Sequence, residues 1–172
     1  NMGWMHDFTE YMKLDPYFRK NAHHMMTFSM EYAYSENYML VLSHDEVVHL
    51  KCSMIEKMPG SYEEKFKNLM AGYAFMTGHP GKKLLFMGQD FGQHREWSEE
   101  RELDWFLLEK EPNHQLQLFV KELLHLYKSN KCLYEYDCWP EGFEWINADD
   151  GDRSIFSFVR HSASGKNNML FV

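Results

Sequence analysis

The sequence predicts an α/β fold, in which part of a (β/α) barrel is followed by the first strands of an all-β domain. Two short apolar runs, at residues 38–42 and 83–87, each lead into a polar loop, and a helical pattern separates them. Such runs are typical of buried parallel strands, and polar groups at their C-terminal ends build the reaction centres of barrels. Beyond residue 130 the pattern changes to that of a β-hairpin. We therefore expect a barrel portion over residues 1–130 and a separate β domain that begins at residue 131.

The N-terminal region is predicted to be helical. Large apolar side chains recur there at spacings of three and four, at Trp4, Met5, Phe8, Tyr11 and Met12. This spacing indicates a short amphipathic helix, which Pro16 must end because its ring cannot continue a helix. Residues 21–36 lack a clean period and are expected to form another short helix or an irregular crossover. The first strand, over residues 38–42, follows.

A longer helix should begin at Ser61, which can form a capping box with Glu64. It should end before the Gly-His-Pro-Gly sequence at residues 78–81. The second strand comes next, and a polar turn bracketed by glycines follows it at residues 88–93. A further amphipathic helix is predicted over residues 113–128.

The last region carries a hairpin signature. Alternating aromatic and polar residues occupy 142–146 and 154–160, and the Asp-Asp-Gly-Asp sequence at 149–152 supplies a turn between them. Residues 169–172 look like the first half of another strand, and the chain does not start with Met. We therefore expect this chain to be a piece of a longer protein.

Charge and composition exclude several classes of protein. The net charge is −8, and the basic pairs Arg19-Lys20 and Lys82-Lys83 are isolated, so nucleic acid is an unexpected partner. No apolar run approaches the roughly 18 residues that a membrane span needs, and no signal peptide is apparent. Cys52, Cys132 and Cys138 form no CxxC pair, which argues against a disulfide framework and a thiolate zinc site. The sequence favours a cytoplasmic protein that contacts no membrane.

The loop after the first strand, Ser43-His44-Asp45-Glu46-Val47-Val48-His49, allows three interpretations. A helical zinc motif needs two His four residues apart, whereas His44 and His49 are five apart, so no metal site is expected. As a carbohydrate site, Asp45 would face a sugar ring and His44 would donate a hydrogen bond to a hydroxyl. In the structural interpretation, these polar side chains merely cap the loop.

Several motifs in this chain resemble those of a known family. They are Asn1 to Asp7, Tyr11 to Pro16, Ser43 to His49, Gly81 to Gly88, Arg95-Glu96-Trp97 and Leu103-Asp104-Trp105. In this order they resemble the bacterial-type 1,4-α-glucan (glycogen) branching enzymes of the α-amylase superfamily. The similarity extends from the first residues into the hairpin.

The resemblance implies roles for individual residues. Asp45 would be the third of three essential carboxylates, at the end of the seventh strand of a (β/α)8 TIM barrel, and His44 would stabilise the transition state. The strand over residues 83–87 would be the eighth. Substrate-binding residues would be Glu46 and Gln89 in the loops after the two strands, and Trp4 and Met5 beside the glucan groove. Residues 131–172 would then begin the C-terminal β-sandwich.

Two differences from the family pattern limit the chemistry that we expect of this chain alone. The family usually has Glu where Asp90 stands, so the role of Asp90 is open. The nucleophilic Asp and the acid/base Glu belong to the fourth and fifth strands, which this chain lacks. Retaining transfer needs two carboxyl groups about 5 Å apart, so we expect an inactive fragment. Its partners would be an α-glucan and the remaining segments of the same enzyme, and no cofactor is expected.

Two alternatives from other classes stay open at this point. One is a metal-dependent barrel hydrolase, and the other is a non-catalytic glucan-binding module. The branching-enzyme interpretation makes a geometric prediction that distinguishes it. It requires Asp45 to share one saccharide cleft with Trp4 and Gln89.

Overall fold

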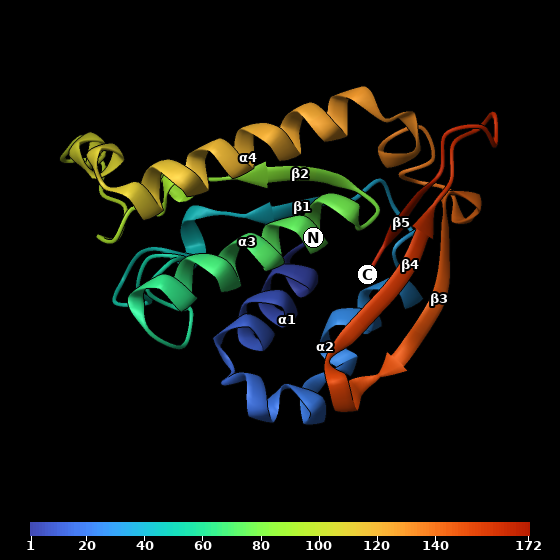
Figure 1. Cartoon of the computed structure of the whole chain (residues 1–172), viewed down its shortest axis with the longest axis horizontal. Helices are drawn as coiled ribbons and strands as arrows, with labels where there is room; N and C mark the ends of the chain where they lie inside the picture. The colour runs from blue at the N-terminus through green and yellow to red at the C-terminus, as the bar shows by residue number, and fades with distance from the viewer.

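The computed structural model describes residues 1–172 and shows a mixed α/β molecule with two small sheets (Figure 1). In the first sheet, β1 (Met39–Leu42) and β2 (Lys82–Leu85) pair in parallel, with Leu40 opposite Lys83. Parallel neighbours need a crossover connection, which α3 (Tyr62–Gly78) supplies. The two predicted strands and the helix between them are therefore confirmed.

The first helix, α1, spans Met2–Lys13. Its N-terminus is capped by Asn1, whose side-chain oxygen accepts a hydrogen bond from the backbone N–H of Trp4 at 3.0 Å. Pro16 ends the helical pattern as predicted, and a 3₁₀ helix, η1 (Pro16–Ala22), begins there. Short turns of α2 (His24–Thr27) and η2 (Phe28–Glu31) form the irregular crossover that leads to β1.

Two longer helices cover the first sheet. The predicted capping box starts α3, since the Glu64 carboxylate accepts a hydrogen bond from the Ser61 N–H at 2.7 Å. The second, α4 (Glu111–Ser129), confirms the helix predicted over residues 113–128 and packs alongside α3 (Figure 1). Two 3₁₀ helices, η4 (Gln89–Phe91) and η5 (Trp105–Glu109), lie on the path from β2 to α4.

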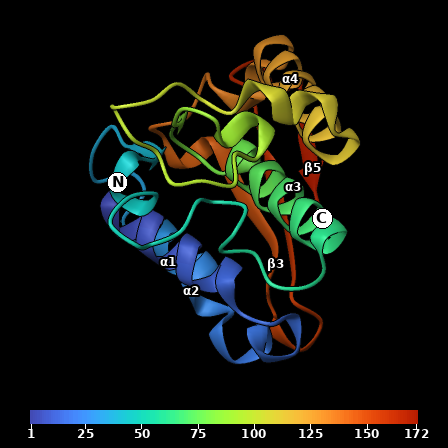
Figure 2. The same ribbon diagram turned by 90° about the vertical axis from the view of Figure 1, so that its left-hand side faces the viewer.

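The second sheet is the antiparallel one that the hairpin signature predicted. It contains β3 (Phe143–Asp150), β4 (Ile155–Arg160) and β5 (Met169–Phe171), with β4 in the centre. In two views at right angles, this sheet lies along the helices α1 and α3 (Figures 1 and 2). The Phe156 ring is 5.5 Å from that of Phe75, so the hairpin packs directly on the preceding helices. The division into domains near residue 130 stays a prediction.

A buried ion cluster ties the second sheet to the helices. The Arg160 guanidinium is fully buried and donates to the Gly142 carbonyl at 3.0 Å, the Gly78 carbonyl at 2.8 Å and the Asp137 carboxylate at 3.0 Å. The same carboxylate accepts hydrogen bonds from Lys82 at 3.0 Å and Tyr127 at 3.1 Å. These contacts join β4, the end of α3, the start of β2 and α4.

The main core lies between α1, β1, α3 and α4 and contains 18 buried apolar residues. The largest fully buried side chains of this core come from α1 and α3, among them Trp4, Phe8 and Tyr73. None of the helices is long and apolar enough to pass through a membrane.

Candidate functional site

The strongest candidate site lies in the loop that follows β1. A single 3₁₀ turn, η3 (His44–Glu46), forms there, and the Ser43 side chain caps it by accepting a hydrogen bond from the Asp45 N–H at 3.3 Å. The Ser43 hydroxyl also donates to the Asp45 carboxylate at 3.0 Å. Because the Asp45 side chain is still 51% exposed, its remaining lone pairs can accept hydrogen bonds from a ligand.

His44 lies beside Asp45 and contacts the end of the second strand. The His44 Nε2 atom is 3.6 Å from the Asp45 carboxylate. The imidazole ring lies 5.8 Å from the ring of Phe86, the residue that follows β2, and 6.3 Å from the ring of Trp97. The two predicted catalytic residues are therefore adjacent and exposed at the C-terminal end of the parallel pair. This arrangement can bind hydroxyl groups and stabilise developing positive charge.

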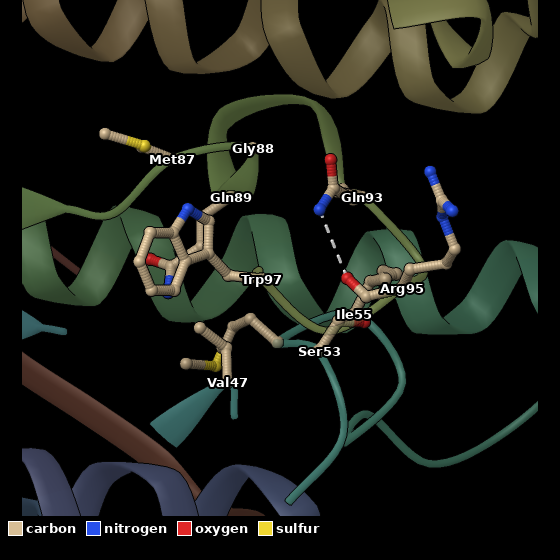
Figure 3. Close-up of a pocket in the computed structure, with 11 residues that line it drawn as sticks. Val47, Ser53, Ile55, Met87, Gly88, Gln89, Gln93, Arg95 and Trp97 are labelled. Atoms are coloured by element: carbon tan, nitrogen blue, oxygen red, sulfur yellow. Dashed lines mark hydrogen bonds between the residues drawn. The ribbon is translucent and has the colours of Figure 1, made fainter. Parts of the chain in front are cut away.

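A small cavity lies beside this site, between the loops that follow the two strands (Figure 3). Its volume is about 10 Å³, which suits one water molecule and excludes a sugar ring. One wall is held by Gln93, whose amide nitrogen donates to the Arg95 carbonyl at 3.2 Å (Figure 3). Two other lining side chains, Gln89 and Ser53, each have a buried polar atom without a protein partner.

The four predicted substrate-binding residues are all buried in this chain. Trp4 and Met5 are only 2% and 0% exposed, because α1 turns its apolar face towards the core. Gln89 is buried in the turn after β2, where its side-chain oxygen accepts a hydrogen bond from the Phe86 N–H at 3.1 Å. In this chain Trp4 and Met5 thus face the core, and their place beside a glucan groove, like a cleft shared by Asp45, Trp4 and Gln89, stays a prediction for the longer protein.

Glu46 is buried directly below the exposed pair. Its carboxylate lies 3.4 Å from His6 Nδ1 and 3.7 Å from the ammonium groups of both Lys51 and Lys57. The two ammonium groups thus offset the charge of the buried Glu46 carboxylate. The substrate-binding role of Glu46 stays a prediction.

Asp90 lies in η4, after the second strand. It borders a shallow depression on α4 together with Gln117 and Lys121, away from Asp45. No group of three His, Cys, Asp or Glu side chains is placed to hold a metal ion.

A feature that sequence reasoning missed is the turn directly after the site. His49, Leu50 and Cys52 have φ angles of 58°, 66° and 66°, in the left-handed region that residues with a Cβ atom rarely adopt. The Glu96 carboxylate accepts hydrogen bonds from the Leu50 N–H at 3.1 Å and the Cys52 N–H at 2.7 Å. No local signal could reveal this turn, because no glycine marks it.

The left-handed backbone predicts that glycine stabilises the protein here. Leu50→Gly and Cys52→Gly should each raise the free energy of unfolding by about 1 kcal/mol, since removal of Cβ relieves the conformational cost of positive φ. Leu50 is 95% exposed, so its substitution removes almost no packing. Urea unfolding of each variant would measure the change. Leu124→Gly, at an exposed position inside α4, is the matched control and should destabilise by a similar amount.

Comparison with known proteins supports the resemblance seen in the motifs. No family model matches the chain. Over all 172 residues it is 66% identical to a 1,4-alpha-glucan branching enzyme GlgB of Butyrivibrio fibrisolvens, and 52% identical to the protein of the same name from Aquifex aeolicus. It is 50% identical to that of Geobacillus stearothermophilus. In each case the chain covers 27% of the relative, so it spans about a quarter of their length. The resemblance to the branching enzymes is confirmed.

Proposed function

We propose that this chain, which is similar over all its 172 residues to one segment of the 1,4-α-glucan branching enzymes, is part of an enzyme that branches glucans. The intact enzyme would cleave an α-1,4-glucan, hold the released chain covalently and transfer it to a 6-hydroxyl in a retaining double displacement. The observation that carries the proposal is the 66% identity over the whole chain, joined to an exposed Asp45 at a strand end.

Asp45 and His44 would act on the glucose unit whose bond is broken. The Asp45 carboxylate would accept hydrogen bonds from two sugar hydroxyls, and its negative charge would stabilise an oxocarbenium-like transition state. His44, next to it, would donate a hydrogen bond to a hydroxyl of the same ring. Neither residue forms or breaks the glycosidic bond, so the nucleophile and the acid/base must come from other segments.

The fold is compatible with a larger barrel. The unit formed by β1, α3 and β2 is one βαβ repeat, and each strand of the parallel pair has an unpaired edge. Further strands of a (β/α)8 barrel could pair there, and the β3 to β5 sheet would begin a C-terminal β-sandwich. These segments would belong to the same cytoplasmic enzyme, and the displacement needs no cofactor.

An assay of new α-1,6 linkages tests this function. The full-length enzyme that carries this chain is incubated with a linear α-1,4-glucan, and branches are counted as the chains released by a debranching enzyme. We expect branch points to accumulate while the number of reducing ends stays constant, because transfer conserves reducing ends and hydrolysis creates them. Binding of glucan without new linkages, or release of reducing ends alone, would contradict the proposal.

A further inference from the structure

The turn at residues 49–52 follows the site directly and is held in an unfavourable backbone conformation. His49, Leu50 and Cys52 all have positive φ, although none is glycine. Such backbone persists only where the surrounding structure over-determines it, and it concentrates at functional sites. The contacts that fix the conformation of this turn therefore indicate its function.

Glu96 provides the strongest of these contacts. The N–H groups of Leu50 and Cys52 converge on the two oxygens of its carboxylate, at 3.1 and 2.7 Å. Backbone N–H groups that converge in a turn form a concave anion site, and here the occupant is a side chain of the same protein. The neighbouring residue adds a second attachment, since the Trp97 N–H donates to the Val47 carbonyl at 3.0 Å.

Lys51 connects this turn to Asp45. It lies between the two residues that Glu96 holds, and its ammonium group donates to the main-chain carbonyl of Asp45 at 2.7 Å. The same group lies 3.7 Å from the buried Glu46 carboxylate. Lys57, whose side chain is 1% exposed, donates to the Lys51 carbonyl from below. The turn, its lysine and the backbone of the site thus form one connected set of contacts.

We propose that Glu96 is a positioning residue for Asp45. It touches neither Asp45 nor a substrate, but it holds the 49–52 turn so that Lys51 stays bonded to the Asp45 main chain. The carboxylate of Asp45 then keeps a fixed direction in spite of its exposure. This inference rests on the proposed role of Asp45 in glucan branching.

The test uses Glu96→Gln in the full-length enzyme. The neutral amide cannot accept both N–H groups with the strength of a carboxylate, so the turn should loosen. We expect kcat for branching to fall about tenfold to a hundredfold, while KM changes less than twofold, because the substitution disturbs the orientation of the Asp45 carboxylate. Deuterium labelling of the Leu50 and Cys52 backbone N–H groups, followed by peptide mass mapping, should become about tenfold faster, because these two groups lose the carboxylate that they donate to.

Two further variants make the test specific. Glu99→Gln removes an equal charge from an exposed position of the same loop and should change neither kcat nor labelling. Lys51→Met keeps the Glu96 contacts but removes the bond to Asp45, so it should lower kcat as Glu96→Gln does without accelerating the deuterium labelling. Since both act along one path, the double variant should lose no more activity than the more damaging of the two single variants.

The outcomes separate the inference from the function it rests on. If the wild-type enzyme forms no branches, the proposed function fails, and deuterium labelling alone decides whether Glu96 holds the turn. If branching is present and Glu96→Gln keeps both its kcat and its labelling rate, the positioning role is refuted. Should Glu96→Gln fail to fold, Lys51→Met decides, and a wild-type kcat in that variant would overturn the inference.

Discussion

Replacing Asp45 with Asn in the full-length enzyme should lower kcat for branching by about 10²- to 10³-fold. The amide has the size of the carboxylate and can keep a hydrogen bond to Ser43, but it carries no negative charge to stabilise an oxocarbenium-like transition state. Half of the side chain is exposed and its side-chain neighbours are few, so the fold should not change. Counting new α-1,6 linkages under saturating glucan measures the effect.

Asp149→Asn is the control for this substitution. Asp149 is exposed at the end of β3, far along the chain from the site, and its loss should leave kcat within twofold of the wild type. Unfolding curves of both variants should coincide with that of the wild type. Wild-type branching by Asp45→Asn would mean that this carboxylate has no part in catalysis, and the proposed site would have to be abandoned.

Asp137→Asn should produce the largest loss of stability. The substitution leaves the Arg160 guanidinium fully buried without an anionic partner, with the Lys82 ammonium also deprived of its carboxylate. Breaking a buried ion pair by removal of one partner costs about 3 to 5 kcal/mol. Urea unfolding at neutral pH measures this loss. The matched control is Lys82→Met, which removes a partner whose side chain is 56% exposed and should cost less than about 1 kcal/mol.

The pH dependence gives an independent check on Asp137. Burial alone would raise the pKa of this carboxyl, but Lys83, Lys82 and Arg160 together hold it below its usual range. The carboxylate therefore stabilises the folded state at any pH above the pKa of about 3.9 in the unfolded chain. This contribution is lost as the pH falls through the lower folded pKa. Equal acid sensitivity in Asp137→Asn and the wild type would contradict the ion cluster.

Local patterns were sufficient to predict most of the helices and strands. The apolar runs at residues 38–42 and 83–87 became the parallel strands, and Ser61 and Glu64 began α3. The Asp-rich sequence at 149–152 marked the connection between β3 and β4, which the structure places at Gly151–Arg153. Each of these signals depends on residues a few positions apart, whose spacing sets backbone hydrogen bonding and the apolar face. The position of Asp45 after a strand is of the same kind, since it follows from chain order alone.

What this chain's sequence determined by itself is therefore its elements, their order and the loop that carries His44 and Asp45. Tertiary structure alone decided which neighbours of that loop are accessible, and it buried Trp4, Met5, Glu46 and Gln89. It also brought Glu96 to the N–H group of Leu50, 46 residues away, in a turn that contains no glycine to indicate its left-handed backbone. Burial and distant contacts depend on which faces of several elements pack together. The spacing of residues within one element does not determine that packing.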